Sequence, residues 1–445
     1  MSQLKKILKK ILPQRWLSLV HKTRAVVACL LYRFPARQIK VIGVTGTNGK
    51  TTVCHLIAKV LEEAGFKVGM ATTIDFQIGS KQWINKTKMT TLSPFALQRF
   101  IRKVVSQRCN YLIIETTSHA ISQYRIWGIP YDVVVFTNLT HDHLDYHQNF
   151  QEYRETKGKL FQGLATSLRK PNTLKVTVVN RDDPNFSYFY DFDADLKLTY
   201  GILGGDCSAQ NILYKADGVD FIVVTSKGKV LVRLNLPGRF NIQNALAAVA
   251  VGLSQGIDLP TIRRGLEKVR GVAGRMEKIN EGQNFVVLVD YAHTPDAFQK
   301  IYETLIPIKK GRLIHVFGAC GDRDRSKRPI MGALAGRYAD FVIITDEDPY
   351  TEDPRKIIEE VAKGVPQGWE KKEKQKKEGV NFWKILDRAE AIDKALSLAR
   401  ENDIVLITGK GAEQAMVVGE KKIPWDDRKV VQRLLKERLT KEKDG

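Results

Sequence analysis

Residues 41–52, VIGVTGTNGKTT, join an apolar run to a glycine-containing turn that ends in Lys50, Thr51 and Thr52. The helical pattern VCHLIAKVLEEAG follows at once. Glycines let a backbone turn its N–H groups toward an anion, and a helix N-terminus adds partial positive charge. A lysine placed here reaches terminal phosphates, and a threonine hydroxyl binds Mg²⁺. The segment therefore predicts an ATP phosphate-binding loop formed by Gly46, Thr47, Asn48, Gly49, Lys50, Thr51 and Thr52.

The loop departs from the usual phosphate-loop spacing, which places a glycine where this chain has Val44. A tight strand-to-helix turn without a ligand is the alternative interpretation. Further polar residues follow strand-like runs: Glu115 in IIETTSH and His143 in TNLTHDHLDYH are candidate magnesium ligands. Lys157, in YRETKGKLF, lies on a helical pattern whose default interpretation is a solvated surface.

Composition restricts the class of protein. A chain of 445 residues is long for one core and predicts about two or three domains. The hydrophobic share of 43% and the charged share of 27% are typical of soluble globular proteins. The five cysteines show no paired spacing, so neither a disulfide framework nor a thiolate metal site is indicated. The net charge of +22 favours polyanions, anionic lipid surfaces or acidic substrates. No basic stripe interleaved with aromatic residues supports nucleic-acid binding.

Strand and helix patterns alternate after the loop, as in KVGMATT, NYLIIETT and DVVVFTNL. This predicts an α/β fold whose first domain is a mononucleotide-binding parallel sheet. Residues 175–236 are richer in short strands, and a second alternation follows from about Arg275. We expect a central ATP-binding domain over residues 39–271 and a Rossmann-like C-terminal domain over residues 272–445.

The first 38 residues precede this alternation. Leucines and isoleucines recur at helical spacing over residues 4–12, with lysines opposite, which predicts a basic amphipathic helix. The stretch from Trp16 to Tyr32 is interrupted by His21, Lys22 and Arg24 and is a poor candidate for a membrane span. Two interpretations remain: the segment packs on the protein's own body, or residues 1–34 contact an anionic membrane.

The ordered motifs TGTNGKTT, ETTSH, TNLTHDHLDYH, FNIQNALAA, GRME, DYAHTPDA, FGACGDRDRSKRP and ITGKGAEQ resemble the Mur ligase family over about residues 39–435. The resemblance implies an ATP- and Mg²⁺-dependent amide ligase that adds a diamino acid to a UDP-muramyl dipeptide in peptidoglycan synthesis. It implies catalytic or metal-binding roles for Lys50, Thr51, Glu115, His143 and Lys157, with Lys157 carbamylated.

The resemblance also implies three binding sets. In addition to the phosphate loop, the ATP set consists of Asn241, Asn244, Arg275, Asp290, His293, Asp322, Arg323, Lys327 and Arg328. For the muramyl peptide they are Thr90, Thr91, Thr117, Gln123 and Arg125. For the incoming amino acid they are Glu347, Asp348, Tyr350, Gly409 and Glu413, with Ala412 where relatives often have histidine.

The implied chemistry is carboxylate activation. ATP phosphorylates the acid, and an amine then attacks the acyl phosphate through a tetrahedral intermediate. Because water would destroy the acyl phosphate, we expect the C-terminal domain to close over the central domain and bring Arg275 and residues 322–328 to the nucleotide.

Two departures from the family pattern affect the substrates. Familiar members have a uridine-binding domain before the ATP-binding strand, so we expect the uridine site to be missing or rebuilt. Enzymes specific for meso-diaminopimelate have an arginine where this chain has Tyr350. The acidic pair Glu347 and Asp348 instead favours lysine or ornithine, unless it is only an acidic turn before a helix.

Alternative functions are another ligase with the same body, of the cyanophycin or polyglutamate type, or a non-catalytic nucleotide-binding scaffold. The complete set of Lys50, Glu115, His143 and Lys157 argues against a scaffold. We expect a cytoplasmic enzyme, with contact to the inner face of a membrane as a further option.

Overall fold

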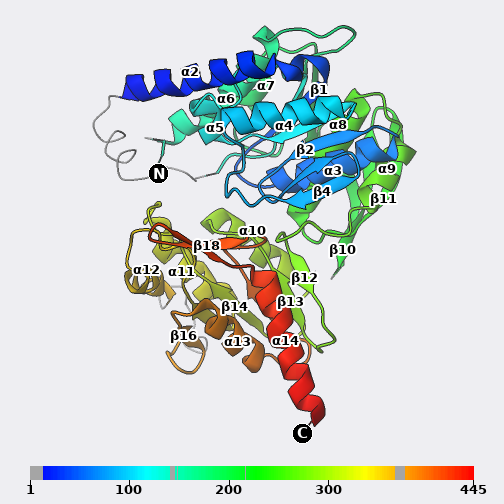
Figure 1. Cartoon of the computed structure of the whole chain (residues 1–445). Coiled ribbons are helices and arrows are strands. Elements are labelled where there is room, and N and C mark those ends of the chain that lie inside the picture. Colours follow the sequence, from blue (N-terminus) through cyan, green and yellow to red (C-terminus); the bar gives the residue numbers. More distant parts are fainter. Residues whose placement is uncertain (1–13, 141–145, 148, 216, 366–375, 445) are drawn as a thin grey trace.

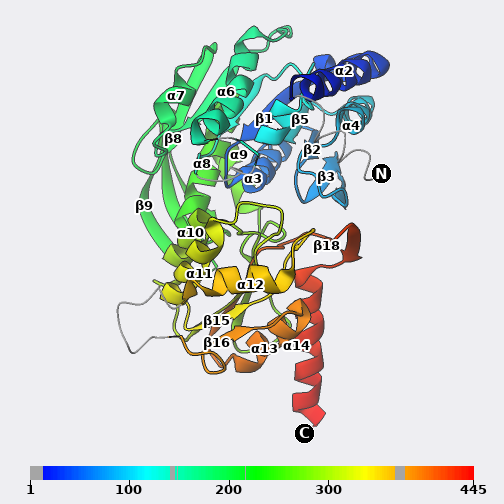
Figure 2. The ribbon, with the colours of Figure 1, turned by 90° about the vertical axis from the view of Figure 1, so that its left-hand side faces the viewer.

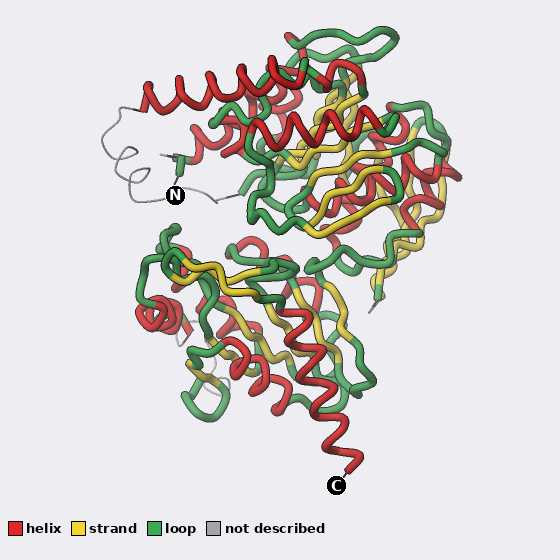
Figure 3. The backbone as a smooth tube through the Cα atoms, viewed as in Figure 1, coloured by secondary structure: helices red, strands yellow, loops and turns green. Residues whose placement is uncertain are grey.

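The computed structural model describes residues 14–140, 146–147, 149–215, 217–365 and 376–444. They form two α/β domains, each built on its own sheet, with the second domain lying beside one edge of the first (Figure 1). Figure 3 shows helices on both faces of the sheets. The predicted α/β class with two successive sheet domains is confirmed.

The central domain contains an 11-stranded sheet in the order β11-β10-β9-β8-β7-β6-β1-β5-β2-β3-β4. Its strands are β1 (Lys40–Thr45), β2 (Val68–Ala71), β3 (Asp75–Ile78), β4 (Lys81–Ile84), β5 (Tyr111–Glu115), β6 (Val133–Phe136), β7 (Val176–Asn180), β8 (Leu196–Gly201), β9 (Cys207–Lys215), β10 (Gly218–Thr225) and β11 (Gly228–Leu234). In the middle of the sheet, the neighbouring strands β9-β8-β7-β6-β1-β5-β2 pair in parallel. At the two ends, β9-β10-β11 and β2-β3-β4 form antiparallel meanders.

Helices cover both faces of this sheet. They are α2 (Gln14–Tyr32), the 3₁₀ helix η1 (Pro35–Gln38), α3 (Lys50–Glu63), α4 (Pro94–Ser106), α5 (Ser118–Ser122), α6 (Phe150–Thr166), α7 (Phe186–Tyr190), α8 (Arg239–Ser254) and α9 (Leu259–Glu267). One hydrophobic core joins the sheet to α3, α8 and α9, and a second joins its other face to α4, α6 and α7. The fully apolar strand β6 is buried between the two cores, as expected of a parallel strand covered on both sides.

The C-terminal domain has a 6-stranded sheet in the order β12-β13-β17-β14-β15-β16, of which only β12 is antiparallel. Its strands are β12 (Glu277–Ile279), β13 (Val286–Val289), β14 (Leu313–Phe317), β15 (Phe341–Ile344), β16 (Phe382–Lys384) and β17 (Ile404–Ile407), followed by the separate hairpin of β18 (Ala415–Val418) and β19 (Lys421–Pro424). Its helices are α10 (Pro295–Leu305), α11 (Lys327–Tyr338), α12 (Pro354–Ala362), α13 (Arg388–Leu398) and α14 (Asp427–Asp444). Helices α10, α11 and α12 pack on one face, and α13 and α14 pack on the other (Figure 2).

Strand register determines where the functional loops lie. Val44 of β1 lies beside Glu115 of β5, and Thr45 lies beside Phe136 of β6. The loops that follow these parallel strands therefore leave the same edge of the central sheet. In the C-terminal domain, Ile407 lies beside both Val289 and Val316, so the loops after β13, β14 and β17 also share one edge.

At the N-terminus, α2 packs against α4, so one of the two interpretations of this segment, packing on the protein's own body, holds for α2. The predicted amphipathic helix over residues 4–12 lies outside the described residues, and so does His143. A search of the described helices found none with the length and apolar content needed to traverse a bilayer.

Candidate active site

The loop between β1 and α3 is held in a conformation that requires its glycines. Gly46 has φ 148° and Gly49 has φ 82°. A Cβ on Gly46 would lie 1.9 Å from the Thr137 hydroxyl oxygen, and one on Gly49 would lie 2.4 Å from Oδ1 of Asn244. Asn138 fixes the middle of the loop, because its backbone carbonyl accepts from the N–H of Thr47 (2.8 Å) and its Oδ1 accepts from the N–H of Asn48 (2.9 Å). The turn thus ends at the start of α3, as the motif predicts.

Two lysines from distant parts of the chain meet at this loop. Lys50 Nζ donates to the carbonyls of Gly46 (3.0 Å) and Thr47 (2.7 Å). Lys157 Nζ, on α6, also donates to the Gly46 carbonyl, at 2.9 Å. Lys157 is only 1% exposed, so the helical residue that sequence alone would treat as solvated is buried beside the phosphate loop.

Glu115, at the end of β5, lies directly beside the loop. Its carboxylate accepts hydrogen bonds from the Thr51 hydroxyl (2.9 Å) and from the backbone N–H (2.8 Å) and hydroxyl (2.9 Å) of Thr73. Arg275, from the start of the C-terminal domain, donates to the Thr51 hydroxyl at 3.3 Å. A hydroxyl and a carboxylate side by side are hard oxygen donors of the kind Mg²⁺ prefers.

A cavity of about 390 Å³ extends from this loop into the space between the domains. Its lining includes Thr47 to Thr52, Thr90, Glu115, Thr117, Arg125, Asn241, Asn244, Arg275, Asp290, His293, Arg323, Lys327, Glu347, Asp348, Tyr350, Gly409 and Glu413. Most of the predicted site residues thus face one space, although they come from both domains. The predicted residues Gly46, Thr91, Gln123, Lys157, Asp322 and Arg328 do not line it.

Several of these six residues contact residues that do line the cavity. The Thr91 hydroxyl donates to the Glu115 carbonyl (2.8 Å), and Gln123 Oε1 accepts from Arg125 Nε (3.0 Å). Arg328 is different: it is fully buried and paired with Glu352 (2.9 Å) and Glu360 (2.6 Å).

Glu352 also accepts from the backbone N–H of Asp322 at 2.6 Å. Asp322 and Arg328 therefore meet at one carboxylate behind the cavity wall, rather than in the cavity itself.

Asn241 and Asn244 project from the first turns of α8. Asn241 Nδ2 donates to the Pro237 carbonyl (2.7 Å), and Asn244 Nδ2 donates to Asn241 Oδ1 (2.9 Å). Across the cavity, the carboxylate of Asp290 accepts from the N–H groups of Met276 (2.7 Å) and Ala292 (2.6 Å). Burial raises the pKa of Asp290, although the Arg275 charge opposes this shift.

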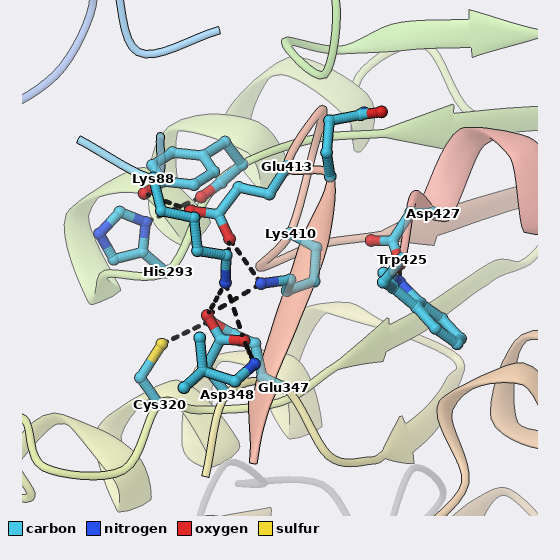
Figure 4. Close-up of polar contacts among 12 residues, drawn as sticks. Lys88, His293, Cys320, Glu347, Asp348, Lys410, Glu413, Trp425 and Asp427 are labelled. Carbon is cyan, nitrogen blue, oxygen red and sulfur yellow. Dashed lines mark hydrogen bonds and ion pairs between the residues drawn. The ribbon is translucent and has the colours of Figure 1, made fainter. Parts of the chain in front are cut away.

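The far end of the cavity contains an ion-paired cluster, which we call the acid-lysine cluster: Lys88, Asp348, Lys410 and Glu413 (Figure 4). Asp348 pairs with both Lys88 and Lys410 at 2.9 Å and accepts from the N–H of Val417 at 2.7 Å. Burial opposes ionisation, but the two ammonium groups outweigh it and lower the pKa of Asp348. The Asp348 charge is therefore already compensated within the protein.

Glu347 is held differently from its neighbour. It is 1% exposed, and its Oε1 accepts from the thiol of Cys320 at 3.0 Å. Its Oε2 has no hydrogen-bond partner among the described residues. A Cβ on Gly409 would lie 2.3 Å from this oxygen, so only a glycine can pack this closely against it. Glu347 thus has an enclosed carboxylate oxygen that lacks a hydrogen-bond partner among the described residues.

Tyr350 follows in the same loop, in the left-handed region at φ 49°. Burial raises the pKa of Tyr350 to about 12, so it is a neutral phenol at neutral pH. The Arg323 guanidinium carbon lies 5.5 Å from the centre of its ring.

His119, in the ETTSH motif, also lines the cavity. Burial, together with the neighbouring His147 and Arg125, lowers the pKa of His119 to about 3, so its imidazole is neutral at neutral pH.

The residues that sequence reasoning missed include Thr73 beside Glu115, Asn138 in the loop, and Lys88 and Lys410 in the acid-lysine cluster. Lys410 stands between the glycines of ITGKGAEQ, and Lys88 lies just before Thr90, so proximity to recognised motifs was the available signal. Thr73 follows a strand end without any motif of its own.

Comparison with known proteins gives the class. Residues 44–252 match the Mur ligase middle domain, and residues 274–411 match the Mur ligase, glutamate ligase domain. A protein of Roseiflexus sp. (strain RS-1) named UDP-N-acetylmuramyl-tripeptide synthetase is 42% identical over 422 residues, covering 93% of this chain and 82% of that protein. A Geobacillus thermodenitrificans protein named UDP-N-acetylmuramoyl-L-alanyl-D-glutamate--2,6-diaminopimelate ligase is 41% identical over 420 residues, covering 94% and 83%.

Solved structures agree with this result. A UDP-N-acetylmuramoyl-L-alanyl-D-glutamate--2,6-diaminopimelate ligase aligns with a TM-score of 0.59 at 32% identity, covering 90% of this chain and 79% of its own. A Mycobacterium tuberculosis folylpolyglutamate synthase aligns with a TM-score of 0.69 at 19% identity, covering 87% and 92%, and shares the fold.

The cavity thus belongs to an amide ligase. The chain is a member of the Mur ligase family, and the family, enzyme class and ligase function predicted from the sequence are confirmed.

Proposed function

We propose that this enzyme adds a diamino acid to UDP-N-acetylmuramoyl-L-alanyl-D-glutamate at the expense of ATP, in peptidoglycan synthesis. One observation carries the proposal: a single cavity is lined both by the phosphate loop and by Glu347, whose carboxylate has an oxygen without a hydrogen-bond partner among the described residues. The names of the relatives indicate the same acceptor.

In this proposal the loop residues Gly46 to Thr52, which include Lys50, hold the ATP phosphates. Since Asn138 already accepts the N–H groups of Thr47 and Asn48, the phosphate contacts come from the start of α3. Asn241, Asn244, Asp290, His293, Arg323 and Lys327 complete the nucleotide site, with Asp322 and Arg328 supporting its wall from behind. Arg275 already bridges the domains at Thr51.

Thr51 and Glu115 are proposed to hold Mg²⁺, which would neutralise charge as the γ-phosphoryl group moves. Their oxygens are 2.9 Å apart at the loop, so the donor set fits a hard cation. His143 is proposed as a further ligand. Lys157, carbamylated by CO₂ at Nζ, would turn a buried cation beside the loop into a carboxylate.

The muramyl peptide is proposed to lie against Thr90, Thr117 and Arg125, which line the cavity between its two ends, with Thr91 and Gln123 supporting them. This places the acid to be activated beside the phosphate loop. An amine entering past Glu347 would then face the acyl phosphate, shielded from water by both domains.

For the incoming amino acid, we propose lysine or ornithine. The Asp348 charge is compensated by Lys88 and Lys410, which leaves Glu347 as the partner for a side-chain amine. Tyr350, Gly409 and Glu413 complete this end. Diaminopimelate is the second candidate, because relatives are named for it.

The domain division is proposed at residues 271 and 272, between α9 and β12. We also propose that the enzyme works in the cytoplasm, where ATP is supplied, with contact to the inner face of a membrane through its N-terminal segment.

The test is phosphate release from ATP in the presence of UDP-N-acetylmuramoyl-L-alanyl-D-glutamate and lysine, ornithine or meso-diaminopimelate in turn. Release that requires both the acid and one of these amines is the expected result. Release with diaminopimelate alone would select the second candidate. No release with any of the three would overturn the proposal.

A further inference from the structure

Helix α2 has two apolar faces. Its exposed face carries six large hydrophobic side chains, each 47–65% exposed: Trp16, Leu19, Val20, Val27, Leu30 and Leu31. At 3.6 residues per turn, all six project within about 120° of one another. Isolated exposed apolar side chains are ordinary, but six on one helix face, interrupted there by the exposed Thr23, mark an interaction surface.

The opposite face of α2 already supplies the packing that holds the helix. Ala25, Ala28 and Cys29 are at most 1% exposed, and α2 packs against α4 on the body of the central domain. The Cys29 thiol also donates to the Trp127 carbonyl at 3.2 Å. The outward stripe is therefore not the core-facing side of this helix.

The charge around the stripe has one sign. Helix α2 contains no Asp or Glu, and the exposed side chains of Lys22 and Arg24 flank the stripe on its two sides. Arg33 and Arg37, just after the helix, are exposed as well. The whole chain carries a formal charge of +22. In α2 and the segment just after it, as far as the structure describes them, the charged side chains are all cationic. Such a stripe complements an anionic lipid surface, whose acyl chains accept Leu and Trp and whose headgroups accept Lys and Arg.

We propose that α2 lies flat on an anionic bilayer, with Trp16, Leu19, Val20, Val27, Leu30 and Leu31 inserted at the headgroup boundary. Figures 1 and 2 both place α2 at the outer edge of the central domain, on the side away from the C-terminal domain. Docking through α2 thus leaves the interdomain cavity accessible. The surface is independent of the ligase reaction, and the proposal stands whichever amino acid the enzyme uses.

The test is co-sedimentation of the full chain with vesicles of phosphatidylglycerol and phosphatidylcholine, compared with vesicles of phosphatidylcholine alone. The wild-type protein is expected to bind the anionic vesicles and to lose binding as salt is raised. The double variant Leu30→Ser/Leu31→Ser is expected to bind at least about tenfold more weakly, because two inserted side chains are lost.

A matched control removes two exposed leucines elsewhere: Leu203→Ser/Leu213→Ser, at positions that are 83% and 58% exposed. This control is expected to bind vesicles like the wild type. A charge variant, Lys22→Gln/Arg24→Gln, is expected to reduce the preference for anionic vesicles several-fold. All three variants change exposed side chains outside the active site, so phosphate release with soluble substrates should be unchanged.

Wild-type protein that fails to bind anionic vesicles would overturn the proposal. So would equal binding by the Leu30→Ser/Leu31→Ser variant. If that variant instead converts a dimer to a monomer in light scattering while vesicle binding is absent, the stripe joins two copies of the chain. Since phosphate release is measured separately, failure of membrane binding is distinguishable from failure of the ligase assignment.

Discussion

The two ends of the cavity are built on different principles. At the phosphate end, one contiguous segment turns between β1 and α3, and glycines fix its path. At the amino-acid end, Lys88 forms ion pairs with side chains of the loops that follow β15 and β17. The first end is shaped by backbone geometry, whereas the second depends on long-range side-chain contacts.

This difference has a consequence for specificity. A backbone anion site recognises any phosphate of the right shape, so it suits a common substrate such as ATP. A cluster in which each charge compensates another can be altered one residue at a time, and each change alters which protein group is left to pair with a ligand. In this chain that unpaired acceptor is Glu347.

The largest effect is expected from Lys50→Ala. Removing the ammonium group beside the loop should reduce phosphate release by about 1,000-fold or more, since it faces the charge that develops during phosphoryl transfer. Steady-state kinetics with saturating substrates measures this loss. Lys59→Ala, on the same helix and ion-paired with Glu62, is the control and should retain activity. Similar losses in both variants would contradict a special role for the loop lysine.

Lys157→Arg tests the second lysine at the phosphate end. Arginine keeps a cation near the Gly46 carbonyl but does not form a carbamate. If the carbamate is needed, activity should fall about 100-fold. Mass spectrometry of the native wild-type protein would also detect the added CO₂. Retention of most activity by the arginine variant would mean that the unmodified cation suffices.

Glu347→Gln tests the contact with the diamino acid at the amino-acid end. Losing a charge-assisted contact of about 1.5–3 kcal/mol should raise the KM for the diamino acid by about 10- to 100-fold. The KM for ATP should stay near its wild-type value. Asp348→Asn is the matched change in the neighbouring residue, and it should act mainly on stability because its carboxylate is paired with Lys88 and Lys410. The reverse pattern would assign the amine to Asp348.

Lys88→Met should have a smaller effect. Lys88 comes from the central domain and Asp348 from the C-terminal domain, so their pair links the domains across the cavity. Lys410 still compensates Asp348 in this variant, which limits the loss of unfolding free energy to about 1 kcal/mol. Urea unfolding measures this loss, and exposed Lys86→Met is the control. A loss no larger than that of Lys86→Met would show that the link contributes nothing.

A separate effect, on the pH dependence of stability, concerns the support of the loop after β17. His315 donates to or accepts from the Thr408 hydroxyl at 2.9 Å, and burial lowers the pKa of His315 to about 3 from 6.5. Between these values the unfolded chain binds the proton that the folded chain excludes, so stability falls as pH drops below 6.5. The slope from this group is at most about 1.4 kcal/mol per pH unit. His315→Phe should flatten the fall measured by urea unfolding at pH 7 and pH 5, and an unchanged slope would contradict this.

The same contrast explains what could be predicted from the sequence. The phosphate loop, Glu115 and the strands that carry them follow from contiguous patterns and from the shared edge of parallel strands. Lys157 needed the family resemblance, because a helical lysine gives no sign of burial. Lys88 and Lys410 went unrecognised, since only the packing of the two domains brings them to Asp348.

The outward stripe on α2 shows the same limit. The residues from Trp16 to Tyr32 revealed an apolar segment, but which face packs inward depends on α4, a helix far along the chain.

In the proposed reaction, one cavity activates a carboxylate with ATP and delivers it to an amine. The most direct measurement uses UDP-N-acetylmuramoyl-L-alanyl-D-glutamate labelled with heavy oxygen in the D-glutamate side-chain carboxylate, and mass analysis of the phosphate released. An acyl phosphate requires one labelled oxygen to leave with the phosphate, and this transfer should depend on the diamino acid for turnover. Phosphate released without label, while amide product forms, would exclude an acyl phosphate intermediate.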